Sequence, residues 1–320
     1  MNNQLIQEIQ EAEKRIRRYI LKTPLLESLY ISQVSKAHVF LKLESEQYTG
    51  SFKIRGATNK VILLTAEEKK RGVITASTGN HGQALARACQ KAGIKCIVFV
   101  PKNADPAKVE AIKSYGAEVE PFGDSSSDTI IHGQAKKVAK ERDMIWVSPY
   151  NDLQIIAGQG TIAAEVLQDL KDIDAMFVTV GGGGLISGIG TYLKSMSPKT
   201  KIVGCLPENS AEMYESIKSG TFVDSHNLDT ISDGSGGAFE QGSITYDICK
   251  EVVDEFILVS EDEIKQSIKL MIDAHHKIIE GAAGVALASF LKKKDNYAGK
   301  NVVILLCGAN IATEKLKEIL

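Results

Sequence analysis

The side chain best placed for covalent chemistry is Lys53, in the segment S-F-K-I-R-G-A at residues 51–57. It directly follows Phe52 at the expected start of a helix, for which Ser51 is the predicted N-cap. A primary amine held beside an aromatic ring can form a covalent bond with a carbonyl group. Taken alone, the pattern also fits a solvated lysine on an amphipathic helix, so other segments must decide.

Two later segments have the composition of anion-binding loops. Residues 77–82, S-T-G-N-H-G, open the next predicted helix, and residues 181–184 are four glycines after an apolar run that predicts a strand. Backbone N–H groups at a helix start, flanked by small residues, bind phosphate or carboxylate oxygens. An ordinary helix cap, a flexible glycine turn and a dinucleotide-binding G-x-G-x-x-G loop are the competing interpretations. The position of the glycines in the middle of the chain disfavours the dinucleotide loop.

In this order and spacing, the three segments resemble those of the pyridoxal-phosphate enzymes of the serine/threonine dehydratase and serine racemase family. The resemblance extends from about residue 23 to residue 310. It implies an α/β fold of two domains with parallel-rich open sheets flanked by helices, that is, fold type II, similar to the tryptophan synthase β chain. It also implies pyridoxal 5'-phosphate as the cofactor and a catabolic lyase, an L-threonine or L-serine dehydratase that releases a 2-oxo acid and ammonia by β-elimination.

Three other functions stay open, two of them within the same family and one outside it. The first is an amino-acid racemase acting on serine, and the second is a dehydratase for another 3-hydroxy amino acid such as hydroxyaspartate. The third is a non-catalytic or nucleotide-binding α/β protein whose glycine run holds a different phosphate. A visible cofactor absorption in the purified protein would exclude the third.

The resemblance also assigns roles to single residues. Lys53 would carry the cofactor and then remove the substrate Cα proton, and Thr78 stands where racemases have a serine on the second face of the substrate. The expected cofactor-binding residues are Phe52, Lys53, Asn80, Gly181, Gly182, Gly183, Gly184, Leu185, Glu280 and Cys307. The expected substrate-binding residues are Ser77, Thr78, Gly79, Asn80 and His81.

Cys307 and Glu280 each have an ordinary structural alternative. By resemblance, Cys307 ends the last strand opposite the pyridine nitrogen, where a neutral thiol leaves that nitrogen mostly unprotonated and favours elimination over transamination. A buried apolar cysteine is the alternative. Glu280 matches a family glutamate near the cofactor, and a helix-cap carboxylate is the alternative.

The chain departs from some family members in three places. Leu206 stands where members that bind a divalent cation have a glutamate, so we predict no metal site, although Glu208 and Glu212 lie nearby. Residues 125–128, a polar turn and helix cap, replace the arginine of the racemases. No regulatory domain is expected after Leu320.

Apolar runs between helical segments predict buried parallel strands. They are residues 73–76, 96–100, 117–119 and 144–147, then 176–180, 202–206, 256–260 and 302–306, with an earlier strand at 38–43. The resemblance divides them into a small domain at 70–149, which closes over the substrate, and a large cofactor-binding domain of 1–69 and 150–320. Residues 219–242, rich in Gly, Ser and Asp, are expected to form a loop that walls the site.

Composition restricts the partners. The 320 residues carry 38 Lys plus Arg against 40 Asp plus Glu, which gives no basic field for nucleic acid or an anionic membrane. The five cysteines are scattered without metal-like spacing, and no run approaches the ~18 apolar residues of a membrane span. We therefore expect a cytoplasmic protein with a small amino-acid substrate, and the resemblance adds a homodimer.

Overall fold

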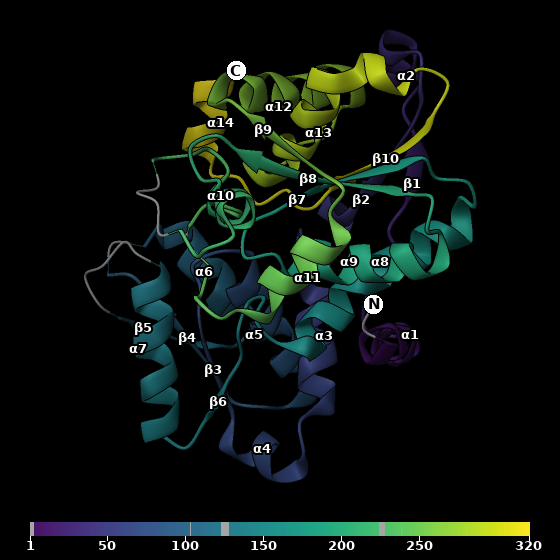
Figure 1. The fold of residues 1–320 in the computed structure, drawn as a ribbon. Helices are drawn as coiled ribbons and strands as arrows, with labels where there is room; N and C mark the ends of the chain where they lie inside the picture. Colours follow the sequence, from purple (N-terminus) through teal and green to yellow (C-terminus); the bar gives the residue numbers. More distant parts are fainter. Residues whose placement is uncertain (1–2, 103, 123–127, 224–227, 238) are drawn as a thin grey trace.

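The computed structural model of the chain describes residues 3–102, 104–122, 128–223, 228–237 and 239–320. In these residues the strands form two sheets, and helices cover both sheets and fill the space between them (Figure 1). The predicted polar turn at 125–128 lies largely outside the described residues. The α/β fold with parallel-rich, helix-flanked sheets is confirmed.

The larger sheet has the strand order β1-β2-β10-β7-β8-β9. Neighbouring strands in this sheet run parallel, except that β1 pairs antiparallel with β2. The central strands β7 and β10 are buried almost throughout, as expected of parallel strands with helices on both faces. The bounds are β1 Leu25–Glu27, β2 His38–Leu43, β7 Ala175–Thr179, β8 Lys201–Pro207, β9 Glu255–Val259 and β10 Asn301–Leu306.

The smaller sheet is entirely parallel, with the order β5-β4-β3-β6. Its bounds are β3 Val73–Ala76, β4 Cys96–Val100, β5 Glu118–Pro121 and β6 Ile145–Trp146. All four strands lie within residues 70–149. However, Ile54 and Val61, which precede residue 70, share a buried cluster with Leu85 and Val98 of the smaller-sheet segment. The domain boundary at residue 69 therefore stays a prediction.

Helices of both layers converge on the space between the sheets (Figure 1). Their bounds are α1 Asn3–Ile16, α2 Leu29–Ser35, α3 Lys53–Leu63, α4 Ala66–Arg71, α5 Asn80–Ala92, α6 Pro106–Ser114, α7 Asp128–Glu141, α8 Leu153–Asp169, α9 Gly184–Met196, α10 Glu212–Ser219, α11 Ile244–Val252, α12 Glu261–His275, α13 Gly281–Lys293 and α14 Thr313–Ile319. Short 3-10 turns lie at η1 Glu44–Glu46 and η2 Lys294–Tyr297.

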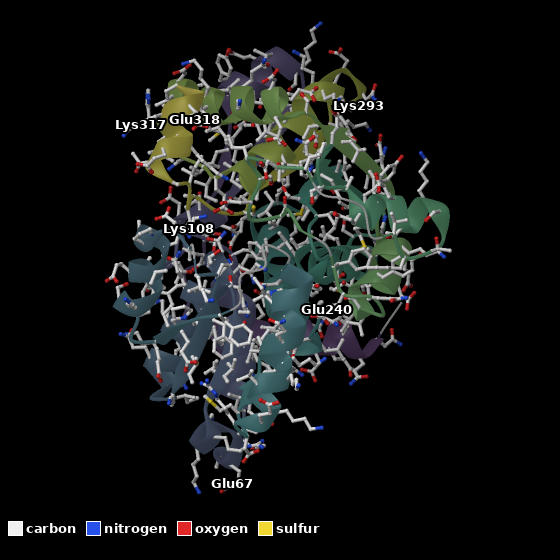
Figure 2. The ribbon with its side chains drawn as sticks, turned by 90° about the vertical axis from the view of Figure 1, so that its left-hand side faces the viewer. Glu67, Lys108, Glu240, Lys293, Lys317 and Glu318 are labelled. Atoms are coloured by element: carbon white, nitrogen blue, oxygen red, sulfur yellow. The ribbon has the colours of Figure 1, made fainter. Side chains whose placement is uncertain are left out.

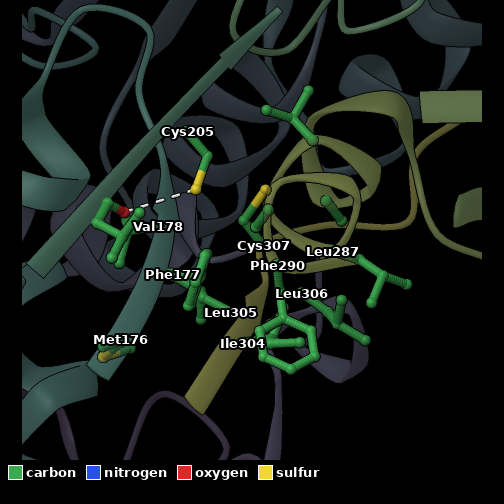
Figure 3. Packing of buried hydrophobic residues seen from close by; sticks show 14 of the residues in the cluster. Met176, Phe177, Val178, Cys205, Leu287, Phe290, Ile304, Leu305, Leu306 and Cys307 are labelled. Carbon is green, nitrogen blue, oxygen red and sulfur yellow. Dashed lines mark hydrogen bonds between the residues drawn. The ribbon is translucent and has the colours of Figure 1, made fainter. Parts of the chain in front are cut away.

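The main core packs α13 against the larger sheet. Phe177 of β7 meets Phe290 of α13 edge to face, with ring centroids 5.4 Å apart. Figure 3 shows both rings in the same buried cluster as Cys307, the residue that follows β10. This packing fixes the end of β10, and with it one wall of the site described below.

A backbone contact between α3 and α8 positions the start of α3. A Cβ atom added to Gly158 of α8 would lie 2.5 Å from the Cα atom of Gly56, so only glycine allows this approach. Beside the crossing, the buried Arg55 guanidinium donates to both carboxylate oxygens of Glu165, at 2.9 and 2.8 Å. The guanidinium also donates to Glu44 at 2.7 Å through two of its nitrogens. The first turn of α3 is thereby held against both α8 and η1.

Candidate active site

Lys53 is the first residue of α3, as the sequence predicts for the start of this helix. Its Nζ donates to the carbonyl oxygen of Pro149 at 3.1 Å and lies 5.3 Å from the ring centroid of Phe52. Burial lowers the pKa of Lys53 to about 8, although Cys307 and Glu280 act in the opposite direction. At pH 7 about a tenth of this amine is neutral, far more than for an ordinary lysine, and the neutral form is the one that attacks a carbonyl and accepts a proton.

The predicted N-cap role of Ser51 is wrong. The residue at the N-cap position is Phe52, which has helical backbone angles and makes no side-chain cap. Ser51 instead forms an isolated antiparallel bridge with Gly308, and the N–H of Phe52 donates to the carbonyl oxygen of Cys307 at 3.0 Å. Pairing with the chain after β10, rather than a side-chain cap, sets the direction in which the chain enters α3.

The glycine run lies between β7 and α9, with Gly183 at the N-cap of α9. Among the described residues, none of the N–H groups from Gly181 to Leu185 donates a hydrogen bond. These groups border a cavity of about 50 Å³. It is lined by Phe52, Lys53, Pro149, Tyr150, Thr179, Gly181, Gly182, Gly183, Gly184, Leu185, Gly234, Ser235, Glu280, Ala282 and Cys307. Free N–H groups at a helix start suit a phosphate.

The glycines are needed mainly for close packing within the protein. A Cβ atom on Gly182 would lie 2.5 Å from the ring of Tyr150, and one on Gly183, whose φ is +83°, would lie 2.9 Å from Cys249 Sγ. A side chain at either position would displace neighbouring residues and strain the loop.

A second cavity, of about 180 Å³, adjoins the first. Both are lined by Lys53, Glu280, Gly181 and Gly182, so the amine lies where the two cavities meet. The predicted substrate-binding residues Ser77, Thr78, Gly79, Asn80 and His81 all line this second cavity. Ser77, Thr78 and Gly79 lie in the turn between β3 and α5, and Asn80 and His81 are the first two residues of α5. The positive end of the helix dipole therefore faces the cavity.

His81 is a buried, neutral imidazole. Its Nε2 lies 3.4 Å from the carbonyl oxygen of Val147, and burial lowers its pKa to about 3. The Lys53 charge acts in the same direction. His81 can therefore position the loop without adding charge to the cavity.

Asn80, Glu280 and Asn310 form a hydrogen-bonded triangle at the junction of the cavities. Asn80 Nδ2 donates to the two carboxylate oxygens of Glu280 at 2.8 and 3.0 Å. Asn310 Nδ2 donates to Asn80 Oδ1 at 2.6 Å, and the Asn310 N–H donates to Glu280 Oε2 at 3.0 Å. Although Glu280 occupies the N-cap position of α13, its side chain caps nothing there and instead orients Asn80.

Some cavity residues were not singled out from the sequence. Tyr150 and Asn310 belong to no motif that identifies them, because both reach the site through tertiary packing. The loop expected at 219–242 contributes residues 233–237 to the wall of the larger cavity. Lys108 of α6 also lines it, and its Nζ lies 2.7 Å from Asp233 Oδ2, so an ion pair joins the two sheet-bearing layers at this cavity. Figure 2 shows Lys108 at the level where these layers meet.

At position 206, where cation-binding family members have a glutamate, this chain has no carboxylate. Leu206 is buried in β8, and Glu208 pairs with Lys292 at 3.5 Å. Within the described ranges, no three His, Cys, Asp or Glu side chains gather as a metal site would require. None of the described helices is long and apolar enough to cross a bilayer.

These cavities meet the requirements of pyridoxal phosphate. Lys53 supplies an amine, the N–H groups of the glycine run suit the phosphate, and the buried Cys307 thiol offers a neutral partner for a ring nitrogen. Residues 16–308 match the family model described as pyridoxal-phosphate dependent enzyme. The chain belongs to this family, and pyridoxal phosphate is its cofactor.

Within this family, the chain is similar over nearly its whole length to threonine dehydratases and to a serine racemase. The chain is 42% identical over 318 residues to the catabolic L-threonine dehydratase TdcB of Staphylococcus aureus, covering 98% of this chain and 91% of that protein. It is 40% identical over 316 residues to the Escherichia coli TdcB, covering 98% and 95%. Among solved structures, a processed threonine deaminase isoform 2 from Solanum lycopersicum superposes with a TM-score of 0.93 at 32% identity, covering 100% and 93%. A serine racemase from Dictyostelium discoideum gives 0.88 at 38% identity, covering 96% and 98%.

Proposed function

We propose that this chain is an ammonia-lyase that eliminates the β-hydroxyl group of L-threonine or L-serine and yields a 2-oxo acid and ammonia. The observation that carries the proposal is the place of Lys53, whose buried amine lies at the junction of a cavity suited to the cofactor and a cavity suited to an amino acid. The dehydratases similar to this chain over nearly its whole length support the same reaction.

The proton chemistry is assigned to Lys53. Bound pyridoxal phosphate supplies an electron sink that acidifies the Cα–H bond of an attached amino acid. Lys53 Nζ accepts that proton, and its pKa of about 8 keeps a useful fraction of the amine in the neutral form that can do so. Burial raises the pKa of the Cys307 thiol, so Cys307 stays neutral and adds no negative charge near the ring nitrogen.

The loop before α5 is assigned to the substrate carboxylate. Ser77, Thr78 and Gly79 border the larger cavity directly before α5. The N–H of Ser77 donates to Phe99 and that of Gly79 to Ser77 Oγ, so among the described residues the N–H of Thr78 is left for a ligand. A carboxylate held there is oriented relative to Lys53, and orientation of this kind lowers the barrier to proton removal. Asn80, fixed by Glu280 and Asn310, is assigned to the phenolic oxygen of the cofactor.

Racemisation is the second candidate, favoured by the similarity to solved serine racemases. It requires an acid on the face of the substrate opposite Lys53, and the resemblance places Thr78 there. The methyl group of a threonine restricts and crowds its hydroxyl group more than a serine would. We therefore assign elimination as the main reaction.

A substrate panel tests the proposal. L-serine, L-threonine and other 3-hydroxy amino acids, including hydroxyaspartate, are incubated with the protein, and 2-oxo acid and D-amino acid are measured over time. We expect pyruvate from L-serine to accumulate well ahead of D-serine. If D-serine appears faster than pyruvate, the protein is a racemase and the dehydratase assignment is wrong. If only hydroxyaspartate is turned over rapidly, the protein is a dehydratase for hydroxyaspartate and not for L-serine or L-threonine.

We also propose that the protein is a cytoplasmic homodimer. The cysteines of the described residues are free and buried, which suits a reducing compartment, and the dimer follows from the family resemblance. Light scattering coupled to size-exclusion chromatography would test the dimer, and a mass of one chain would contradict it.

A further inference from the structure

Glu280 is a buried carboxyl group that the proposed reaction does not use. Its side chain is 2% exposed and forms part of the wall shared by the two cavities. Oε2 accepts hydrogen bonds from Asn80 Nδ2 and from the Asn310 N–H, both at 3.0 Å. Oε1 accepts only from Asn80 Nδ2, at 2.8 Å, among the described residues. Oε1 therefore has a free acceptor position.

No cation of the described residues forms an ion pair with Glu280. The charged and titratable groups that face it are Lys53 from α3, Cys307 after β10, Asp233 from the loop before α11, and Lys108 from α6. Asn80 of α5, Gly234, Gly308 and Asn310 complete its surroundings and carry no charge. Lys108 is itself paired with Asp233.

These surroundings disfavour the ionised form of Glu280. Burial is the main cause and raises its pKa to about 7, with Asp233 acting in the same direction. The hydrogen bonds from Asn80 and Asn310 and the charge of Lys108 oppose the shift only in part. In the cofactor-free protein near neutral pH, the group is therefore divided between its two protonation states.

We propose that Glu280 takes up a proton when pyridoxal phosphate binds, and keeps it while the cofactor stays in the site. The cofactor brings a phosphate and a phenolic oxygen into the cavity that Glu280 borders, and it excludes water from the same space. Added negative charge and lost hydration both penalise a second anion, and no cation enters to compensate. The proton comes from solvent and is bound at Oε1, and no covalent bond elsewhere is broken.

Protonation keeps the Asn80 geometry intact. Oε2 still accepts from Asn80 and Asn310, and a protonated Oε1 keeps a lone pair for its bond from Asn80 while it becomes a donor as well. A neutral Glu280 would also add no negative charge to the wall of the larger cavity, where the substrate is proposed to bind. Glu280 therefore acts as a positioning residue that adjusts its charge to the cofactor.

Proton uptake can be measured without turnover. The chain is freed of cofactor and titrated with pyridoxal phosphate by calorimetry, at about pH 7.5, in buffers of different ionisation enthalpy. We expect the wild type to take up about half a proton or more beyond the uptake of Glu280→Gln, and this difference should shrink at about pH 6, where Glu280 is already protonated. The proton change on the cofactor is common to both proteins. The change at Lys53 is not, because the Glu280 charge raises the pKa of Lys53, so the Lys53 amine is titrated separately in each cofactor-free protein and its contribution subtracted.

Glu212→Gln is the matched control, because Glu212 is equally buried and borders neither cavity. It should behave as the wild type does. Equal uptake by the wild type and Glu280→Gln would overturn the proposal.

A spectroscopic measurement covers the case in which Glu280→Gln fails to fold. The infrared spectrum of the wild-type holoenzyme should contain the carbonyl band of a protonated carboxyl group in a dry site, and this band should be weaker in the cofactor-free protein at the same pH. The absence of any such gain on cofactor binding contradicts the proposal without the use of a variant.

Discussion

At the scale of single residues, burial drives the titratable groups of this site toward their neutral forms. It lowers the pKa of Lys53 to about 8 and raises that of Glu280 to about 7. It also keeps His81 and Cys307 uncharged. The polarity of the site therefore comes mainly from the backbone N–H groups and from the bound cofactor. Hydrogen bonds between them are electrostatically stronger in this buried site than in water.

Lys53→Ala should abolish the covalent link to the cofactor and lower turnover on the order of a thousandfold or more, because both nucleophile and base are lost. The visible absorption of the bound cofactor and the rate of 2-oxo acid release measure the two effects. Lys60→Ala, on the same helix but paired with Asp152 outside both cavities, is the control. An active Lys53→Ala protein that keeps the absorption would remove Lys53 from its assigned role.

Acid should destabilise the fold through His81. Its pKa of about 3 in the folded protein lies below the ordinary 6.5, so below pH 6.5 the unfolded chain binds a proton that the folded protein does not. This contribution is complete above pH 6.5 and falls by about 1.4 kcal/mol per pH unit as the pH drops toward 3. Denaturant unfolding at several pH values should therefore show a shallower acid loss for His81→Gln.

Glu280 should give the opposite dependence. Its raised pKa means that its contribution is complete below pH 4.5 and is lost as the pH rises to about 7. The slope difference between wild type and Glu280→Gln should therefore have the opposite sign to that for His81→Gln over pH 4.5–6.5. The same sign for both variants would show that one of these burial arguments is wrong.

At the scale of elements, the crossing of α3 and α8 sets the position of the Lys53 amine relative to the carbonyl group that accepts its hydrogen bond. Lys53 begins α3, and Pro149, which accepts from its Nζ, lies shortly before α8. The two helices touch at Gly56 and Gly158, and a Cβ atom added to Gly158 would lie 2.5 Å from the backbone of Gly56. Because backbone cannot move aside as a flexible side chain can, this contact determines where the amine points.

Gly158→Ala should therefore cost about 1–3 kcal/mol of unfolding free energy and also weaken cofactor binding, because it separates the helices. Gly133→Ala is the matched control: this glycine lies inside α7, and its added Cβ atom would meet no atom within 4 Å. The control should gain about 0.5–1 kcal/mol from helix propensity. Thermal unfolding and cofactor titration measure both, and unchanged cofactor affinity in Gly158→Ala would contradict the positioning argument.

The strands that run parallel were predictable from the sequence to within about two residues of their ends, whereas the short antiparallel strand β1 was not predicted. The run at 176–180 became β7 at Ala175–Thr179, and the run at 202–206 lies within β8. Buried parallel strands are continuous apolar runs between helices, so local composition identifies them. The N-cap of α3 was not predictable in the same way. Ser51 has the right side chain, but its backbone pairs with Gly308, a contact with a residue 257 positions later in the sequence.

At the scale of the whole molecule, the site combines residues that no local pattern connects. Lys53, the loop before α5 and the glycine run were recognised as motifs. Tyr150 and Asn310 were not, because they enter through the packing of distant segments. The role of the smaller-sheet segment in closing over the substrate remains a proposal, and the ion pair at the larger cavity offers a way to test it.

Lys108 of α6 and Asp233 of the loop before α11 form that ion pair at 2.7 Å, with side chains 25% and 38% exposed. If it holds the smaller-sheet segment over the substrate, Lys108→Ala and Asp233→Asn should each raise KM with little change in kcat. An exposed pair of this kind is worth about 0.2–1 kcal/mol, so the expected increase is up to about fivefold. The double variant should be no worse than the worse single variant, because both remove the same interaction.

Lys315→Ala is the control that distinguishes closure of the smaller-sheet segment over the substrate from a general effect of positive charge on KM. Lys315 of α14 lies 3.6 Å from the same Asp233 carboxylate, but it belongs to the C-terminal segment and does not connect to the smaller sheet. Its removal should leave KM unchanged, since the Lys108 contact survives. Equal increases in KM for Lys315→Ala and Lys108→Ala would show that the positive charge near Asp233, and not the contact with the smaller-sheet segment, determines KM. Additive effects in the double variant would mean that the two side chains act on the substrate independently, and the smaller-sheet segment would then need another contact to hold it closed.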